Sequence, residues 1–365
     1  MADTHLRDSQ YQMRLRGQDF TAAMNAACRM AKARGADVIL HAGDLLDTLR
    51  PSARTVHDLR TIHENLIADE MTMLVIRGNH DFTEPAWPEV IADECEGPGC
   101  YGLQNFDNRS HVIEKNGHVL RIHGLPFMQR QALIEHMTMV HADILMWHGM
   151  VREFVGYPLG DDCDVVSVDD FPRGRYQLVA LGDIHVPAIH VHYGTQFIYP
   201  GSTELCSRGE PLEKGFYLHT FEAEDGQPMR LVDTEFVPIP NRRKIAMHVG
   251  SEEDLAEVIR VVRDALPEQP LVMVTFHRDF ADTPKRLAAA IDTTRCILRV
   301  SMKASAATQG EVERESIARM SMLDFLPRFL HPGSELFQLG QLMIDPRIDA
   351  HQALESYVEK ALEGK

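Results

Sequence analysis

Short apolar runs alternate with longer amphipathic segments in the first half of the chain. The runs at residues 38–40, 73–76, 144–147 and 178–181 are expected to be buried strands. Apolar residues at helical spacing predict two helices in this half, and these helices cover residues 17–34 and 52–68. Because strands that alternate with helices form parallel sheets, the pattern predicts an α/β fold.

The pattern changes further along the chain. Residues 84–110 are rich in Pro, Gly and acidic residues and are expected to be loops with a short helix. Residues 188–199 and 215–222 alternate as antiparallel strands do, with Pro200-Gly201-Ser202 as the expected turn between them. After Pro238-Ile239-Pro240 the predicted order is strand, helix, strand, helix, strand, which indicates a compact α+β unit.

Three regions follow from these changes. Residues 1–238 are expected to form the α/β domain, and residues 239–305 a small α+β domain that ends in a polar linker. Residues 306–365 are expected to be a helical tail, interrupted at Pro332-Gly333 and Pro346. A chain of 365 residues is long enough for two domains, each with its own core.

Loops that carry Asp, Asn or His follow the predicted strands of the first region. One of them, Gly78-Asn79-His80-Asp81, lies at the carboxyl end of a strand, where open α/β sheets place their ligand sites. Another pair, Asp3 and His5, has side chains that point the same way if the segment is extended. The candidate residues at the strand ends are Asp3, His5, Asp44, Asn79, His80, His148, Asp183 and His185.

Five strand ends that each offer such side chains indicate a dinuclear metal site. Mixed oxygen and nitrogen ligation without thiolate suits Mn²⁺, Fe²⁺ or Zn²⁺. Taken alone, the loop at 78–81 has a simpler interpretation as an ordinary polar turn. The other four strand ends favour the metal site.

Composition narrows the class of protein. The formal net charge of −17 argues against strong, unaided and non-specific binding to nucleic acid, although a nucleic-acid substrate stays possible when metal ions or a partner supply positive charge. We find no apolar run near the roughly 18 residues of a membrane span and no signal-peptide profile. The six cysteines show no paired spacing, so free thiols in a reducing, cytoplasmic location are expected, with a bridge between Cys95 and Cys100 as the alternative.

The motif order Asp-x-His, Gly-Asp-x-x-Asp, Gly-Asn-His-Asp, His-Gly and Gly-Asp-x-His resembles that of the calcineurin-like metallophosphoesterase superfamily. Further motifs resemble its DNA-repair exonuclease branch, which includes the SbcD-type nuclease subunit. They are Gly43-Asp44-Leu45-Leu46-Asp47 with Arg50-Pro51-Ser52, Leu181-Gly182-Asp183-Ile184-His185, and Tyr199-Pro200-Gly201-Ser202-Thr203-Glu204 with Glu213-Lys214-Gly215-Phe216. The resemblance implies a four-layer αββα sandwich, a capping domain at 239–305 and a tail at 306–365 that binds an ATPase partner.

The resemblance also implies a role for each candidate residue. By this resemblance His80 is the acid that protonates or stabilises the leaving oxygen. Asp81 is expected to orient His80 or, alternatively, only to finish the turn. The metal ligands implied are Asp3, His5 and His185 for one ion, Asn79, His148 and Asp183 for the other, and Asp44 as the bridge between them. Arg7 and Arg50 flank the motif loops and are expected to contact phosphate or, alternatively, to be solvated.

Two features depart from the family pattern. Asp183 stands where the family usually has His, and its harder oxygen is expected to shift metal preference toward Mn²⁺ or Mg²⁺; the alternative is that Asp183 turns away. Only two residues precede Asp3, so either the first strand is very short or Met1 is internal to a longer product. We favour the second interpretation.

The resulting hypothesis is a DNA exonuclease and endonuclease that acts with an SbcC-type coiled-coil ATPase in end processing, repair or recombination. Two divalent ions are expected, with Mn²⁺ first and Mg²⁺, Fe²⁺ or Zn²⁺ as alternatives, and hydrolysis by direct attack of water. The family also implies a homodimer without membrane attachment. Two other functions stay open: a metallophosphoesterase for small phosphodiesters, nucleotides or phosphoproteins, and a catalytically weak scaffold that docks its ATPase.

Overall fold

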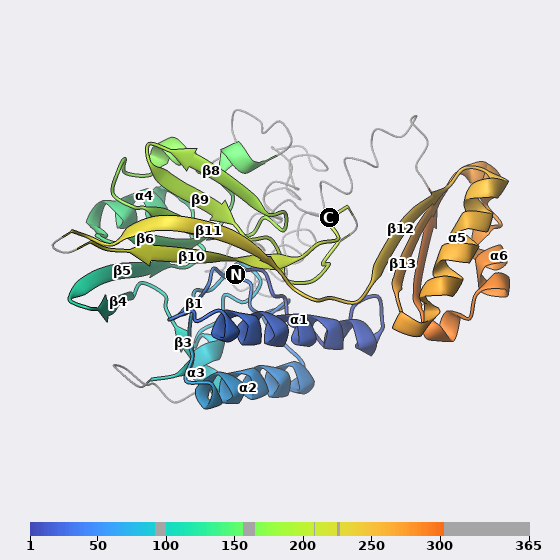
Figure 1. Ribbon diagram of the computed structural model, residues 1–365, viewed down its shortest axis with the longest axis horizontal. Coiled ribbons are helices and arrows are strands. Elements are labelled where there is room, and N and C mark those ends of the chain that lie inside the picture. Colours follow the sequence, from blue (N-terminus) through green and yellow to red (C-terminus); the bar gives the residue numbers. More distant parts are fainter. Residues whose placement is uncertain (92–99, 156–164, 208, 225–226, 303–365) are drawn as a thin grey trace, which may run out of the picture. The chain divides into compact units, whose positions relative to one another are not determined.

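The computed structural model describes residues 1–91, 100–155, 165–207, 209–224 and 227–302 (Figure 1). The chain divides into two compact units, the first spanning Met1–Arg242 and the second beginning at Arg243. This division lies four residues after the boundary at 238 that the sequence predicts. The helical tail expected at 306–365 lies outside the described residues.

The first unit contains two separate sheets and a two-stranded ribbon. The smaller sheet is parallel and has the order β1-β2-β3; its strands are β1 (Ile39–His41), β2 (Thr72–Val75) and β3 (Gly102–Asn105). The helices that accompany it are α1 (Arg14–Ala33), α2 (Ala53–Ala68) and α3 (Trp87–Ile91). Helix α2 begins after Ser52, whose hydroxyl accepts a hydrogen bond from the backbone N–H of Thr55 at 3.2 Å.

The larger sheet has six strands in the order β4-β5-β6-β7-β9-β8. Its middle strands β5, β6, β7 and β9 run parallel, and both edge strands run antiparallel to their neighbours. The strands are β4 (Ser110–Lys115), β5 (His118–Leu125), β6 (Ile144–His148), β7 (Leu178–Gly182), β8 (Ala188–His192) and β9 (Thr195–Tyr199). Helix α4 (Arg130–Met139) and the short 3₁₀ helices η1 (Arg152–Phe154) and η2 (Val168–Asp170) connect its strands.

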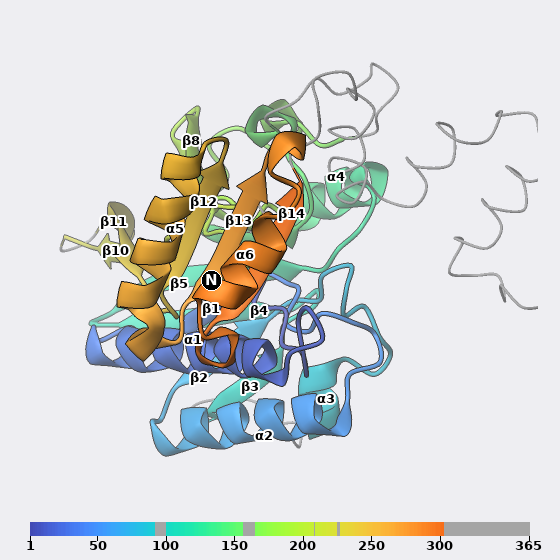
Figure 2. The same ribbon diagram turned by 90° about the vertical axis from the view of Figure 1, so that its right-hand side faces the viewer.

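The period-two alternation of the strands separates three layers of core. In β2, Met73 and Val75 pack with α1 and α2, whereas the intervening Leu74 packs between the two sheets. In β6, Met146 packs between the sheets and Trp147 packs on the α4 side. Helices α1 and α2 lie side by side in both views (Figures 1 and 2). The order helix, sheet, sheet, helix confirms the predicted four-layer α/β fold.

One prediction about strand pairing is wrong. Strands β8 and β9 form a hairpin around Tyr193 and Gly194, both with positive φ, so the turn does not lie at 200–202. Strand β10 (Gly215–Glu222) pairs instead with β11 (Arg230–Pro238) in an antiparallel ribbon. Alternation of side chains identifies a strand but not its partner, because pairing depends on contacts made elsewhere in the fold.

The second unit is a parallel sheet of order β12-β13-β14 with two helices on the same face (Figure 1). Its strands are β12 (Lys244–Val249), β13 (Leu271–Phe276) and β14 (Ile297–Met302), and its helices are α5 (Glu252–Ala265) and α6 (Thr283–Ala290). Short 3₁₀ helices lie at η3 (Leu266–Glu268), η4 (Arg278–Phe280) and η5 (Thr293–Arg295). The observed order of elements is the predicted one.

The cysteines differ in their oxidation state. Cys28, Cys206 and Cys296 carry free thiols, but Cys100 is disulfide-bonded, so the expectation of free thiols throughout is wrong at that position. Within the described ranges, every helix is too short or too polar to span a bilayer.

Candidate metal centre

The centre forms where the carboxyl ends of strands from both sheets of the first unit meet. Asp44 follows β1, Asn79 follows β2, His148 ends β6 and Asp183 follows β7. Asp44 lies in the middle and is 2% exposed. One of its carboxylate oxygens is 3.5 Å from Nε2 of His5, and the other is 3.5 Å from Nε2 of His148. The two carboxylate oxygens of Asp44 therefore face two different histidines.

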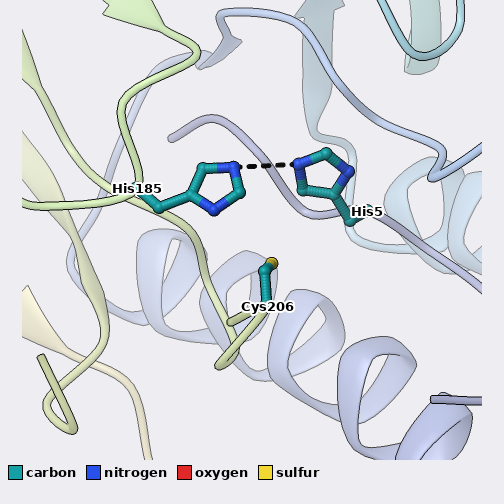
Figure 3. Close-up of side chains that lie close together, drawn as sticks. All are labelled: His5, His185 and Cys206. Carbon is teal, nitrogen blue, oxygen red and sulfur yellow. Dashed lines mark hydrogen bonds between the residues drawn. The ribbon is translucent and has the colours of Figure 1, made fainter. Parts of the chain in front are cut away.

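His5 and His185 face each other at one side of Asp44 (Figure 3). Their Nε2 atoms are 3.1 Å apart, and their rings meet edge to face. Two imidazole nitrogens bound to one tetrahedral cation, each about 2.1 Å from it, would be about 3.4 Å apart. The spacing of the two rings therefore fits two ligands of one cation.

His148 and Asn79 face each other at the other side of Asp44. The Nδ1–H of His148 donates to the carbonyl of Ala42 at 2.8 Å, which leaves a lone pair on Nε2. That Nε2 lies 3.0 Å from Oδ1 of Asn79. Burial lowers the pKa of His148, so its ring is neutral near pH 7. Two acceptor atoms that face each other at this distance fit a shared cation.

Asp3 and Asp183 are joined through the backbone. The N–H of Asp183 donates to Oδ1 of Asp3 at 3.0 Å, and Asp3 is fully buried. The Asp183 side chain is half-buried, and burial raises its pKa, which the neighbouring His148 partly opposes. Within the part of the chain that the structure describes, the groups that could hold a metal are Asp3–Asp44–His148, His5–Asp44–His80 and His5–His185–Cys206. Asp183 is in none of these groups.

The backbone of the centre is strained. The φ angles of Asp3, His5 and Asp44 are 52°, 43° and 54°, and that of Asp183 is 100°. Residues other than glycine avoid this left-handed region, and those that adopt it cluster at functional sites. The Asp-x-His segment is therefore not regularly extended, and both side chains reach the centre from left-handed backbone positions.

Glycines make room for the strand-end loops. A Cβ at Gly78 would lie 2.1 Å from Oδ1 of Asp44. A Cβ at Gly43 would lie 2.3 Å from Nδ1 of His148, and Gly43 has a φ of 92°. Both positions therefore require glycine for Asp44 and His148 to approach each other.

Buried charge dominates the electrostatics of the centre. Burial raises the pKa of Asp3 well above its usual range and raises that of Asp44 to about 6. Burial also lowers the pKa of His5 well below its usual range, and the neighbouring His185 and His80 add to this effect. Nδ1 of His5 is buried without a hydrogen-bond partner. Buried carboxylates and imidazole lone pairs without cationic partners are unfavourable, and divalent cations compensate for them.

His80 and Asp81 have different surroundings. The exposed ring of His80 donates from Nδ1 to the carbonyl of Asp47 at 3.0 Å. The carboxylate of Asp81 accepts from the backbone N–H groups of Leu45, Leu46 and Gly78 at 2.7, 3.2 and 2.8 Å. Asp81 therefore holds the two loops at 43–47 and 78–81 together. These bonds match the alternative, in which Asp81 closes the turn, and the ring of His80 is held by the backbone carbonyl of Asp47. A role of Asp81 in orienting His80 stays a prediction.

The two candidate phosphate contacts differ in their surroundings. Arg7 pairs with Asp47 at 2.6 Å, donates to the carbonyl of His5 at 3.0 Å and stacks on Phe20. Arg50 is exposed. Contact with phosphate stays a prediction for both residues.

Three residues beside the centre have no role predicted from the sequence: Glu210, Lys214 and Cys206. Glu210 accepts a hydrogen bond from Nδ1 of His185 at 2.9 Å, and it pairs with the buried Lys214 at 2.7 Å. Cys206 lies beside His5 and His185. Burial lowers the pKa of His185, but hydrogen bonds with Cys206 and Glu210 outweigh it and raise that pKa well above the usual range. Glu210 and Cys206 lie in a loop rather than at a strand end, which is why the strand pattern did not find them.

Comparison with known proteins identifies the family. Residues 1–224 match the family model described as the calcineurin-like phosphoesterase superfamily domain. The DNA double-strand break repair protein Mre11 of Methanocaldococcus jannaschii is 22% identical over 295 residues, which are 77% of this chain and 76% of that protein. The protein of the same name from Halobacterium salinarum is 28% identical over 230 residues, 61% of this chain and 55% of its own length.

A third relative with this name, from Methanopyrus kandleri, is 21% identical over 351 residues, 87% of this chain and 74% of its own length. A solved structure of a conserved uncharacterized protein from Streptococcus pneumoniae TIGR4, a predicted phosphoesterase, aligns with 65% of this chain and 94% of its own at 12% identity, with a TM-score of 0.26. The family model covers more than half of the chain, and the predicted resemblance is confirmed. The chain belongs to the calcineurin-like phosphoesterase superfamily.

Proposed function

We propose that this chain is a DNA nuclease that hydrolyses phosphodiester bonds with two divalent cations, of which Mn²⁺ is the first choice. The observation that carries the proposal is Asp44, whose two oxygens face His5 on one side and His148 on the other at 3.5 Å each. The relatives named as double-strand break repair proteins support DNA as the substrate.

The proposed ligand sets follow the two sides of Asp44. His5 and His185 would hold one cation, and Asn79 and His148 would hold the other. Asp3 is proposed with His5 and His185, as the family resemblance implies, and its carboxylate also lies within 4.8 Å of the ligand atoms of Asp44 and His148. Asp183 is proposed as a further ligand of the second cation, through its half-buried carboxylate. Two such cations supply a nucleophilic water and neutralise the charge of the phosphate.

His80 is proposed as the acid for the leaving oxygen. Its Nδ1 is occupied by the carbonyl of Asp47, so Nε2 is the atom that would carry the proton. The ring is exposed, which lets a long substrate reach it. The carboxylate of Asp81 accepts hydrogen bonds from Leu45 and Gly78 and so links the loop that carries His80 to the loop that carries Asp44.

We propose that the chain acts with an SbcC-type coiled-coil ATPase and forms a homodimer in the cytoplasm. The net charge of −17 supports the need for a partner that contributes positive surface to DNA binding. Residues 239–305 are proposed as the capping domain and residues 306–365 as the ATPase-binding segment.

The test is digestion of linear duplex DNA with Mn²⁺, with and without the ATPase, by the wild-type chain and by His80→Ala. We expect cleavage by the wild type and a loss of about 10²-fold or more in the variant, the usual scale for a positioned acid. His118→Ala is the matched control, because that ring also pairs through Nδ1 with a backbone carbonyl, at 3.0 Å, but lies outside the centre.

Two outcomes would reject the proposal. Hydrolysis of a small chromogenic phosphodiester without cleavage of DNA in any condition would favour a small-molecule phosphoesterase. Absence of both activities, with the ATPase still bound, would favour a scaffold.

A further inference from the structure

A cysteine lies at the metal centre beside two of its histidines. The sulfur of Cys206 points toward the rings of His5 and His185 (Figure 3). One ligand atom from each of the three residues lies within 4.8 Å of those of the other two. The thiol is free and half-buried. Neither the ligand sets nor the acid proposed above use it.

The backbone of Cys206 is held in place from both sides. Its N–H donates to Oε2 of Glu210 at 3.0 Å, and its carbonyl accepts from the side chain of Gln10 at 2.7 Å. Glu210 and Gln10 are both buried. The sulfur itself has a long contact of 3.5 Å with the carbonyl of Glu204. The position of the thiol is therefore built by buried polar groups and is not an accident of an open loop.

The same carboxylate also sets the ring of His185. Oε1 of Glu210 accepts from Nδ1 of His185 at 2.9 Å, so Nε2 is the ring nitrogen that faces the centre. Lys214 neutralises Glu210 at 2.7 Å and is 1% exposed. A carboxylate behind a histidine in this way is the usual support of a metal-binding imidazole. Glu210 thus positions two members of the cluster at once.

Two imidazoles and a thiolate form a softer set of ligands than the imidazole, amide and carboxylate of His148, Asn79 and Asp183, which are proposed for the other side of Asp44. Thiolate ligands favour Zn²⁺ and similar cations, whereas Mn²⁺ and Mg²⁺ prefer oxygen. We propose that His5, His185 and Cys206 form a thiophilic cation site at one end of the centre, which takes Zn²⁺-class ions in preference to Mn²⁺. On binding, the S–H bond breaks, the sulfur donates a lone pair to the cation, and the proton passes to solvent.

The site rests on the proposed metal centre, whose two histidines it shares. It makes the two ends of the centre unequal in metal preference. Zn²⁺-class ions are therefore expected to displace Mn²⁺ at this end and to leave the end at Asn79 and His148 to the harder ion. Free Zn²⁺ would then change the metal content of the protein without any change in its fold.

The test uses the full chain, without bound metal, titrated with Cd²⁺. A thiolate bound to Cd²⁺ gives an ultraviolet charge-transfer band. We expect this band in the wild type and a weaker or absent band in Cys206→Ser and Cys206→Ala. The difference in absorbance between the wild type and either variant is expected to saturate at one Cd²⁺ per chain. Cys296→Ser, which removes a buried free thiol of the second unit, is expected to keep the band.

A second measurement is the affinity for Zn²⁺ in competition with a chromogenic chelator. We expect Cys206→Ser to bind Zn²⁺ at least about tenfold more weakly, the lower end of the loss seen when metal sites lose a supporting partner. Its affinity for Mn²⁺ is expected to equal that of the wild type. A circular-dichroism melt verifies that each variant is folded.

An unchanged Cd²⁺ band or unchanged Zn²⁺ affinity in folded Cys206→Ser or Cys206→Ala would overturn the proposal. The binding tests are separate from the nuclease test. A chain that binds Cd²⁺ through Cys206 but cleaves no DNA would reject only the proposed function. A chain that cleaves DNA with Mn²⁺ but lacks the Cys206-dependent band would reject only the thiophilic site.

Discussion

The two units build parallel sheets in the same way but use the ends of their strands differently. In the first unit, β1 leads into Asp44, which is buried in a left-handed conformation between two histidines. In the second unit, β12 leads to Ser251, whose hydroxyl accepts from the N–H of Asp254 at 3.1 Å and caps α5. One strand end is strained and charged, and the other is an ordinary cap. The comparison shows that chemistry resides in the loops and not in the sheet itself.

The two units also differ in the burial of their charged pairs. Glu210 and Lys214 of the first unit are 2.7 Å apart and almost fully buried. Glu252 and Arg286 of the second unit are 2.6 Å apart, but their side chains are 63% and 39% exposed. Buried pairs are sensitive to the loss of one partner, whereas exposed pairs contribute little. Stability of the first unit therefore depends on the exact placement of its buried Glu210–Lys214 pair, whereas stability of the second unit does not depend on its exposed Glu252–Arg286 pair.

The largest effect is expected from Lys214→Met. This substitution leaves Glu210 buried without its cation, which is expected to lower the free energy of unfolding by about 3–5 kcal/mol. The measurement is denaturant unfolding of the full chain followed by circular dichroism. A change below about 1 kcal/mol would show that the buried pair is no more important than an exposed one.

Asp44→Asn is expected to lower DNA cleavage by about 10²–10³-fold, the scale of losing one group that stabilises charge in a transition state. The amide cannot bridge two cations as a carboxylate does. Cleavage rates at saturating Mn²⁺ measure the effect. Asp282→Asn in the second unit is the matched control. Equal loss in both variants would remove the distinction between the units.

The pH dependence of stability isolates the buried charge of Asp44. Burial raises its pKa from 3.8 in the unfolded chain to about 6, so the folded state holds the proton more tightly. The free energy of unfolding contributed by this group therefore falls as pH rises from about 4 to 6, by on the order of 3 kcal/mol, and stays low above 6.

Unfolding of the wild type and of Asp44→Asn in chelator measures this contribution. The stability of the variant relative to the wild type is expected to rise with pH across that window. A difference that does not vary with pH would mean that the carboxyl of Asp44 ionises in the folded state as easily as in water.

The smallest effect is expected from Arg286→Ala. Its pair with Glu252 is solvated, and hydrogen bonding to Arg286 lowers the pKa of Glu252 at the surface. Unfolding free energies of the variant and of the wild type are expected to agree within error. A clear loss of stability would show that the second unit also depends on its ion pairs.

The sequence predicted those parts of the fold whose signal is local. The apolar runs of β6 and β7 and the element order of the second unit match the structure. A strand buried on both faces is a continuous apolar run, and an element buried on one face shows periodic apolar residues, so both can be recognised in the sequence. Strand β11 was missed, since Arg230–Pro238 is mostly exposed and its apolar residues are interrupted by the polar run at 233–235. Its partner β10 was assigned to the wrong hairpin for the same lack of a local signal.

The candidate centre follows the same division. Asp44, Asn79 and His148 follow apolar runs within four residues, so the sequence pattern placed all three at strand ends. Glu210 and Cys206 reach the centre from a loop, and only tertiary contacts show this. The left-handed backbone of Asp3 and His5 was also beyond local prediction, because non-glycine residues with positive φ have no reliable sequence signal.

The central claim is that Asp44 joins two cation sites in one centre. Titration of the metal-free chain with Mn²⁺, with free Mn²⁺ followed by electron paramagnetic resonance, tests it most directly. The account predicts two bound Mn²⁺ per wild-type chain and a loss of at least one in Asp44→Asn, with Asp282→Asn unchanged. One or no bound Mn²⁺ in the wild type, or two in Asp44→Asn, would contradict it.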